Sequence, residues 1–298
     1  MTDFVSNRFR SPRHGLLGWP LDYLANADWL CAVRRAITSR LPFPVLASDI
    51  RDVVYLTWMV DVERVSPYVP DGIELWDAGG KTPFSILTYR HGCFGPVVTG
   101  PLRRLFPSPL QSNWRFYLRS VPPGVPPVNT VLFIKNVLDH ALYALGSRIF
   151  SDALPSHLAD RLVLERTECG YAIELESGRG SSPTLKARLE HSRERELPES
   201  FQTAFASWDA AVEYLVCQDG AVTWVEPLQR LAFSQISLPV MLETIEPLRM
   251  TPADGFHCPL LQSLGDIGPP LCFCLPAVKF RAVSDFVVRP IRTNEDVA

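Results

Sequence analysis

Titratable side chains are concentrated among apolar residues in one stretch of the chain, residues 129–158. Histidine ionises near neutral pH and therefore suits proton transfer, whereas arginine can hold a carboxylate through two parallel hydrogen bonds. A buried lysine amine can act as a base or a nucleophile. If the chain carries a chemical site, we expect it here, and its candidate residues are Lys135, Asp139, His140, Arg148 and His157.

Each of these residues also has a purely structural explanation. Lys135 ends an apolar run and could be a solvated charge at the end of a strand. Asp139 and His140 are neighbours on an expected helix, so their side chains diverge by about 100° and cannot both face one site. Packing therefore also explains His140. Arg148 could bind a ligand carboxylate or form a buried ion pair within the protein.

A strand followed by a helix would position these residues. Residues 131–134 are continuously apolar, which indicates a buried strand, and apolar residues from Val137 to Ile149 then recur at helical spacing. Along the rest of the chain, β-branched and aromatic runs separated by turns predict about ten strands and about four helices. Strands and helices do not alternate. We therefore expect an α+β protein built on a predominantly antiparallel β-barrel or sandwich.

Three further segments bear on a site. Residues 1–20 predict a polar arm, and residues 20–40 predict an amphipathic helix that either packs on the core or docks on a partner or membrane surface. Residues 93–112 hold four prolines without periodicity, which predicts a long loop over a surface or pocket mouth. In the strand that follows, Arg115 and Tyr117 share one face. A solvated or ion-paired face explains that pattern as readily as a binding face.

Composition excludes several classes of function. The net charge of -3 argues against a general nucleic-acid-binding protein, and no apolar stretch is long enough for a transmembrane helix. The seven cysteines are scattered and the N-terminus lacks a signal-peptide core, so we expect a cytoplasmic protein. Cys272 and Cys274 lack nearby metal-ligand partners, and buried free thiols explain them better than a metal site.

Four strings of residues resemble one known family. The most distinctive is VPDGIEL at residues 69–75, and FSILTYR, SNWRFYLR and LPSH follow it. Over roughly residues 48–250, their order resembles the DUF2071 family, which is itself similar in fold to acetoacetate decarboxylase. The resemblance implies a barrel around a central small-molecule pocket. We accordingly expect an N-terminal helical extension at 1–48, one acetoacetate decarboxylase-like barrel domain at 49–290 and a polar tail at 291–298.

The remote similarity to the decarboxylase also implies site residues. The decarboxylase has an arginine before its first long strand, matched here by Arg51, and a pocket glutamate, matched by Gln111, which cannot ionise. Its two adjacent lysines after a proline correspond to Ser156 and His157. The lysine that forms the Schiff base is then missing, and neither serine nor imidazole can form an imine. Decarboxylation by that route is not expected unless Lys135 supplies the amine.

These arguments predict a barrel protein that binds a small, largely apolar ligand ending in a carboxylate or a carbonyl. We expect no cofactor and no metal, and a homo-oligomer is left open. The predicted ligand-binding residues are Arg51, Gln111, Arg115, Arg148 and Ser156.

Two alternatives remain open. The first is a lyase, isomerase or hydrolase of keto or hydroxy acids, which would use His157 and Lys135 as catalytic acid and base. The second is a scaffold that docks a protein partner through the N-terminal helix and the loop at 93–112.

Overall fold

The computed structural model describes residues 6–13, 18–38, 40–251 and 255–289. The predicted tail at 291–298 lies outside these residues. The strands are β1 (Leu46–Asp61), β2 (Lys81–Arg90), β3 (Gly95–Pro96), β4 (Leu110–Tyr117), β5 (Thr130–Leu138), β6 (Ser156–Leu158), β7 (Arg161–Arg166), β8 (Gly170–Glu176), β9 (Leu185–His191), β10 (Gly220–Val225), β11 (Arg230–Ser237), β12 (Glu246–Met250) and β13 (Leu271–Val287).

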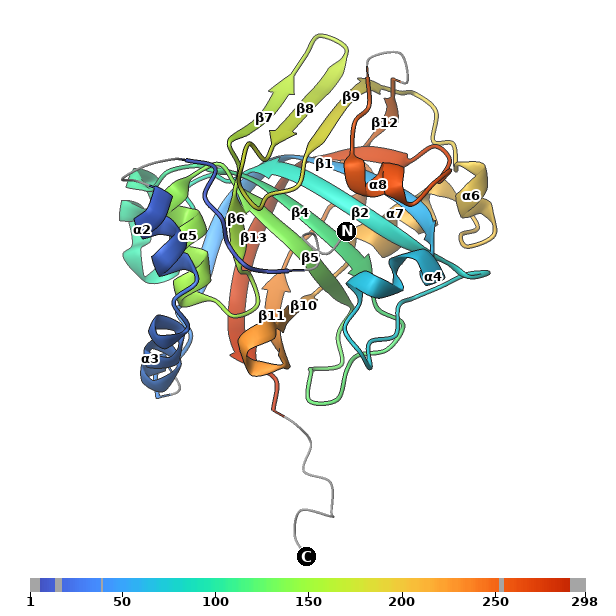
Figure 1. The fold of residues 1–298 in the computed structure, drawn as a ribbon. Coiled ribbons are helices and arrows are strands. Elements are labelled where there is room, and N and C mark those ends of the chain that lie inside the picture. The colour runs from blue at the N-terminus through green and yellow to red at the C-terminus, as the bar shows by residue number, and fades with distance from the viewer. Residues whose placement is uncertain (1–5, 14–17, 39, 252–254, 290–298) are drawn as a thin grey trace, which may run out of the picture.

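Seven of these strands close into a barrel (Figure 1). The order around the barrel is β1, β2, β4, β5, β10, β11 and β13, and β13 pairs with β1 to complete it. Every neighbouring pair is antiparallel except β5 and β10, which run parallel. The predicted, predominantly antiparallel barrel is therefore confirmed, with one parallel contact in its wall.

The remaining long strands form a second layer against the barrel. The sheet continues from β13 through β12 to β9, β8 and β7, and the last three form the antiparallel meander above the barrel in Figure 1. One face of the barrel strands, carrying side chains such as Trp58 and Trp114, packs with Ile173 of this layer. The other face, carrying Tyr117 and Phe273, lines the barrel interior.

The helices lie around this body. They are α2 (Gly18–Ala25), α3 (Asp28–Thr38), α4 (Val62–Val65), α5 (Ala141–Phe150), α6 (Glu199–Gln202), α7 (Trp208–Val216) and α8 (Pro259–Ser263), with short 3-10 helices η2 (Ser66–Tyr68), η3 (Val97–Leu105), η4 (Glu226–Leu228) and η5 (Leu242–Thr244). No described helix has both the length and the apolar content needed to cross a bilayer. Ala211 and Leu215 of α7 pack into the interior core, so α7 covers the barrel near the end of β4.

β1 contains a bulge at Asp52, where it pairs with β13 on one side and β2 on the other. Pro276 lacks a backbone N–H and cannot donate to the sheet. It stands opposite Asp52, the position skipped between the pairs Arg51 with Ala277 and Val53 with Leu275. Asp52 adopts a φ of 52°, and the register of β1 against β2 shifts at this point.

Two predicted helices differ in the structure. The expected helix at 20–40 is two helices, α2 and α3, and no residue of α3 is buried. The apolar side chains of Trp29, Val33 and Ile37 are more than half exposed, so this helix does not pack its apolar face on the core. The expected helix from Val137 begins only at Ala141, because the preceding residues continue β5 in pairing with β4.

Candidate ligand-binding site in the barrel

The barrel interior contains a small cavity of about 70 Å³, called the inner cavity below. Side chains from β1, β2, β4, β11 and β13 form most of its wall, and most of them are aliphatic or aromatic. A space of this size holds a short organic acid or one end of a longer ligand, rather than a drug-sized molecule. Its polar and charged lining residues are Tyr55, Tyr89, His91, Gln111, Asn113, Arg115 and Ser234.

Arg115 is the charged group of the inner cavity and is only 3% exposed. Its Nη2 donates to the backbone oxygen of Leu215 at 2.8 Å, so the guanidinium lies where α7 covers the barrel. Weaker contacts join it to the hydroxyls of Tyr55 and Tyr117 at 3.3 to 3.4 Å. The guanidinium carbon also lies 5.5 Å and 5.3 Å from the centres of those two rings.

No carboxylate of a described residue forms an ion pair or hydrogen bond with Arg115. Its acceptors are a backbone carbonyl and two phenol oxygens, all uncharged. Burial lowers the pKa of Arg115, but the oxygens of Tyr117 and Tyr55 outweigh that effect and raise the pKa, so the group stays protonated. A buried charge without a counter-ion costs roughly several kcal/mol. The closed end of the inner cavity is therefore suited to an anion.

Gln111 lies on the same face of β4 as Arg115, four residues nearer the opening. Its Oε1 is 2.7 Å from His91 Nε2, and His91 Nδ1 is 2.8 Å from the hydroxyl of Ser48. Burial lowers the pKa of His91 to about 4, so the ring is neutral at pH 7. A neutral ring that donates from Nε2 fixes the Gln111 carbonyl and leaves the Gln111 amide N–H groups for the cavity.

Two more polar side chains hold one another inside the barrel. The Tyr89 hydroxyl donates to Asn113 Oδ1 at 2.7 Å, and the Asn113 amide nitrogen donates to Asn136. Burial raises the pKa of Tyr89 well above its ordinary value and that of Tyr55 to about 12. Both phenols therefore remain protonated at neutral pH and can serve as hydrogen-bond donors.

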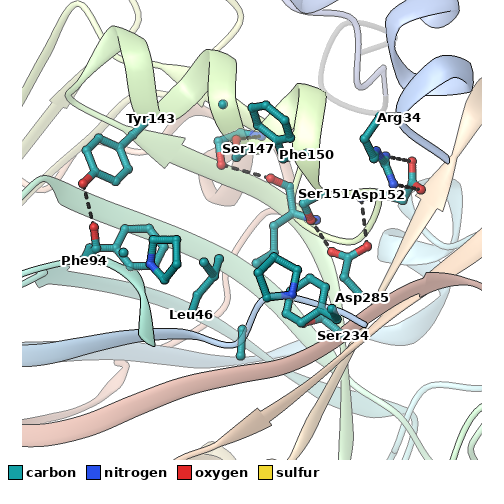
Figure 2. Close-up of a pocket in the computed structure, with 18 of the residues that line it drawn as sticks. Arg34, Leu46, Phe94, Tyr143, Ser147, Phe150, Ser151, Asp152, Ser234 and Asp285 are labelled. Carbon is teal, nitrogen blue, oxygen red and sulfur yellow. Dashed lines mark hydrogen bonds and ion pairs between the residues drawn. The ribbon is translucent and has the colours of Figure 1, made fainter. Parts of the chain in front are cut away.

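The inner cavity adjoins a larger space of about 850 Å³, called the mouth chamber below (Figure 2). It lies between the barrel opening, helices α3 and α5, and the loop that contains η3. The proline-rich loop is therefore at a pocket mouth: Phe94, Phe106 and Pro107 line the chamber. The residues that line both spaces are Phe94, Gln111, Leu154 and Ser234.

The two arginines of the mouth chamber are bound to one carboxylate, and a second carboxylate is held by neutral donors. Asp152 accepts hydrogen bonds from Arg34 at 2.8 Å and from Arg35 at 2.7 Å, which attaches α3 to the chamber (Figure 2). Despite burial, the two arginines lower the pKa of Asp152. Asp285 accepts from the hydroxyl of Ser151 and from the backbone N–H of Asp152 at 3.1 Å. The two arginines of α3 are therefore already paired with a carboxylate of the protein.

Lys135, Arg148 and His157 come together as expected from their neighbourhood in the sequence, but they line neither space. Lys135 Nζ lies 3.4 Å from His157 Nε2. Burial, with the nearby charges of Lys135 and Arg148, lowers the pKa of His157 well below its ordinary value. His157 Nδ1 is 2.7 Å from the hydroxyl of Ser181, so both ring nitrogens are engaged.

The N-terminal arm covers this cationic cluster. The backbone oxygen of Ser6 accepts a hydrogen bond from Lys135, and that of Asn7 accepts one from Arg148. The ring of Phe9, 3% exposed, lies 5.3 Å from the Arg148 guanidinium carbon. Burial lowers the pKa of Arg148 to about 10, which leaves it protonated. The arm at 6–13 is thus a packed cover, rather than an open entrance to these side chains.

The two residues aligned with the lysine pair point to opposite sides of β6. Ser156 lines the mouth chamber, whereas His157 faces the arm, because successive residues of a strand alternate. Arg51 is exposed at the bulge in β1 and lines neither space. Of the predicted ligand-binding residues, the structure brings Gln111, Arg115 and Ser156 to the adjoining spaces and places Arg51 and Arg148 elsewhere.

Sequence reasoning missed several residues of the inner cavity. Asn113 was detectable, because the alternation that includes Arg115 and Tyr117 continues back through Asn113 to Gln111. His91 and Tyr89 had no such signal. Their place depends on the pairing of β2 with β4, which brings Tyr89 opposite Gln111.

The fold was compared with solved structures. An acetoacetate decarboxylase from Legionella pneumophila is similar at a TM-score of 0.51 and 14% identity, covering 82% of this chain and 87% of the other. An acetoacetate decarboxylase-like enzyme from Sphingomonas wittichii has a TM-score of 0.52 at 12% identity, covering 84% and 95%. The enduracididine biosynthesis enzyme MppR, complexed with the condensation product of pyruvate and imidazole 4-carboxaldehyde, has a TM-score of 0.50 at 14% identity, covering 83% and 90%. These likenesses establish an acetoacetate decarboxylase-like fold.

Sequence comparison adds the family. No curated protein matches the chain. The DUF2071 family, described as an uncharacterized conserved protein, matches residues 47–214, from the start of β1 to α7. That segment is more than half of the 298 residues and contains β4, the strand that carries both Gln111 and Arg115. The protein is therefore a member of the DUF2071 family.

Proposed function

We propose that the protein binds a small organic ligand in the barrel, with a carboxylate or carbonyl group of the ligand held at Arg115. The observation that carries this proposal is a protonated, buried guanidinium whose described partners are all uncharged. A ligand carboxylate would supply the missing charge and could form two parallel hydrogen bonds. Gln111 supports the same assignment, since an amide N–H can donate to an anion whereas a glutamate there would repel it.

Chemistry through an imine finds no support at this site. The chain has four lysines, Lys81, Lys135, Lys186 and Lys279. None of them lines the inner cavity or the mouth chamber. Ser156, which we matched to one of the decarboxylase lysines from the resemblance, lies on the chamber wall, and a serine cannot form a Schiff base. We therefore infer binding, or chemistry of another kind, rather than decarboxylation through an imine.

Acid–base catalysis by His157 and Lys135 has less support than binding. A lysine ammonium can only donate, so when Lys135 donates to His157 Nε2 the ring proton lies on Nδ1 and points to Ser181. In that arrangement His157 has no free nitrogen for a substrate. It also faces the arm at Ser6 and Arg10 rather than the cavity.

Calorimetric titration with butanoate, pyruvate and acetone tests the proposal. Butanoate and pyruvate should bind the wild-type protein, and Arg115→Met should weaken them at least tenfold, because the variant loses the cation but keeps an unbranched side chain. Arg119→Met is the matched control, since Arg119 is exposed and pairs with Asp77 outside the cavity. Binding that is equal in the wild-type protein and Arg115→Met would contradict the proposal, as would an effect of the same size in Arg119→Met.

A further inference from the structure

The two adjoining spaces differ in chemical character. The inner cavity has a cation without a carboxylate partner at its closed end, whereas the arginines of the mouth chamber, Arg34 and Arg35, are already bound to Asp152. The remaining wall of the chamber is largely aliphatic and aromatic, with contributions from the segment before β1, the η3 loop, α5 and the end of β13. A ligand that extends through both spaces would therefore have its anionic end in the inner cavity and its other end against the apolar wall of the mouth chamber.

The rim of the mouth chamber exposes large apolar side chains. Leu41 is 61% exposed, Leu142 is 72% exposed and Phe150 is 69% exposed, and all three line the chamber. Exposed apolar groups that gather around a concave space are typical of a ligand or partner site. Here they surround the chamber, which shares Gln111 and Phe94 with the wall of the inner cavity.

We propose that the ligand is an aliphatic monocarboxylate of medium chain length, with its carboxylate at Arg115 and its hydrocarbon chain in the mouth chamber. This inference rests on the proposed function and adds the nature of the ligand's other end. One carboxylate is specified because, among the described lining residues, Arg115 is the cation without an acidic partner, whereas Arg34 and Arg35 are bound to Asp152. A hydrocarbon chain is specified because the chamber offers about 850 Å³ and its arginines, Arg34 and Arg35, are already bound to Asp152, which leaves no free described cation there for a second carboxylate.

The proposal makes a quantitative prediction about chain length. Each methylene removed from water contributes about 0.8 kcal/mol, which corresponds to a roughly fourfold tighter dissociation constant. Calorimetric titration with butanoate, hexanoate, octanoate and decanoate, all below their micelle concentrations, should therefore show affinity rising about tenfold or more for each two methylenes until the chamber is filled. Decan-1-ol, which carries the chain without the charge, should bind much more weakly than decanoate.

Two leucines provide a matched pair of variants. Leu142 lines the chamber, whereas Leu102 is similarly exposed, at 64%, on η3 and does not line it. Leu142→Gln should reduce decanoate affinity several-fold while leaving butanoate affinity unchanged, and Leu102→Gln should change neither. Because both residues are exposed, neither substitution is expected to disturb folding.

The outcomes separate this inference from the proposed function. Butanoate binding that depends on Arg115, together with no gain from longer chains, would overturn the chain-length inference and leave the proposed function standing. Failure of every acid to bind would overturn both. Equal affinity of decanoate and decan-1-ol would also overturn the inference, since binding would then be hydrophobic only.

Discussion

Replacing Arg115 by methionine tests whether this buried cation truly lacks a carboxylate partner in the protein. Removing one member of a buried ion pair typically destabilises a protein by about 3 to 5 kcal/mol, because the other charge is left unpaired. Arg115 contacts only uncharged acceptors, so the substitution strands no anion. It also leaves the Leu215 carbonyl satisfied, because the Tyr117 hydroxyl donates to the same oxygen at 3.2 Å.

The expected magnitude follows from two opposing terms. Loss of the guanidinium removes the cost of burying a charge, roughly several kcal/mol. It also removes hydrogen bonds to neutral acceptors, and the strongest of these contributes about 1.5 to 3 kcal/mol to stability. We expect the free energy of unfolding of the ligand-free protein to stay within about 1 kcal/mol of wild type or to rise. Carboxylate binding should nevertheless be lost.

Urea unfolding followed by tryptophan fluorescence measures the stability, and calorimetric titration with butanoate measures the binding. Asp152→Asn is the contrasting variant, since it removes the carboxylate shared by Arg34 and Arg35 and should lower the free energy of unfolding. A decrease of 3 kcal/mol or more in Arg115→Met, about the size seen for broken buried ion pairs, would refute the claim that the cation is unpaired. The assignment of Arg115 to a ligand carboxylate would then lose its basis.

Three further outcomes are expected. Gln111→Glu adds a negative charge between the mouth chamber and Arg115, and this charge repels the carboxylate of the ligand. Carboxylate affinity should therefore fall at least tenfold at pH 8 and recover partly at pH 5. An unchanged dissociation constant would show that the ligand does not pass Gln111. His91 has a folded pKa of about 4 against 6.5 unfolded, so the unfolded state binds more protons between these values and stability falls as pH falls through that window. This residue should account for a loss of about 2 kcal/mol between pH 8 and pH 5, and a pH profile of His91→Gln as steep as that of wild type would contradict it. In Asp152→Asn, backbone hydrogen exchange should speed up in α3, which buries no side chain of its own, and remain unchanged in β4. If α3 exchanges at the same rate in the variant as in the wild-type protein, other contacts hold this helix.

Local patterns in the sequence determined much of the barrel. The alternation in β4 assigns Arg115 and Tyr117 to one face and Trp114 and Phe116 to the other, and the structure shows that division between the interior and the outer core. The strings that resemble DUF2071 predicted the family and the decarboxylase-like fold. The prediction from alternation succeeds because side-chain alternation in a strand is a local geometric property that a short sequence window already contains.

Local patterns also failed at identifiable places. Val137 and Leu138 have helical spacing with the residues after them, but they complete β5, because pairing with β4 and β6 outweighs helical periodicity. The amphipathic helix predicted at 20–40 left core packing and surface docking open. In the structure the apolar face of α3 remains exposed, and polar contacts of Arg34 and Arg35 with Asp152 hold the helix at the chamber.

The amino-acid sequence by itself determined the residue types: a barrel-forming chain with a lysine-poor composition, an arginine within an apolar strand, and a serine and a histidine at the positions that the resemblance matches to the decarboxylase lysines. Only the tertiary structure decided which of these share a cavity. Closure of β1 against β13, more than two hundred residues apart in the chain, creates the interior around Arg115. The crossing of the arm over β5 and β6 then covers His157 and Lys135. Such long-range contacts depend on the packing of the whole chain and leave no periodic signal in any one segment.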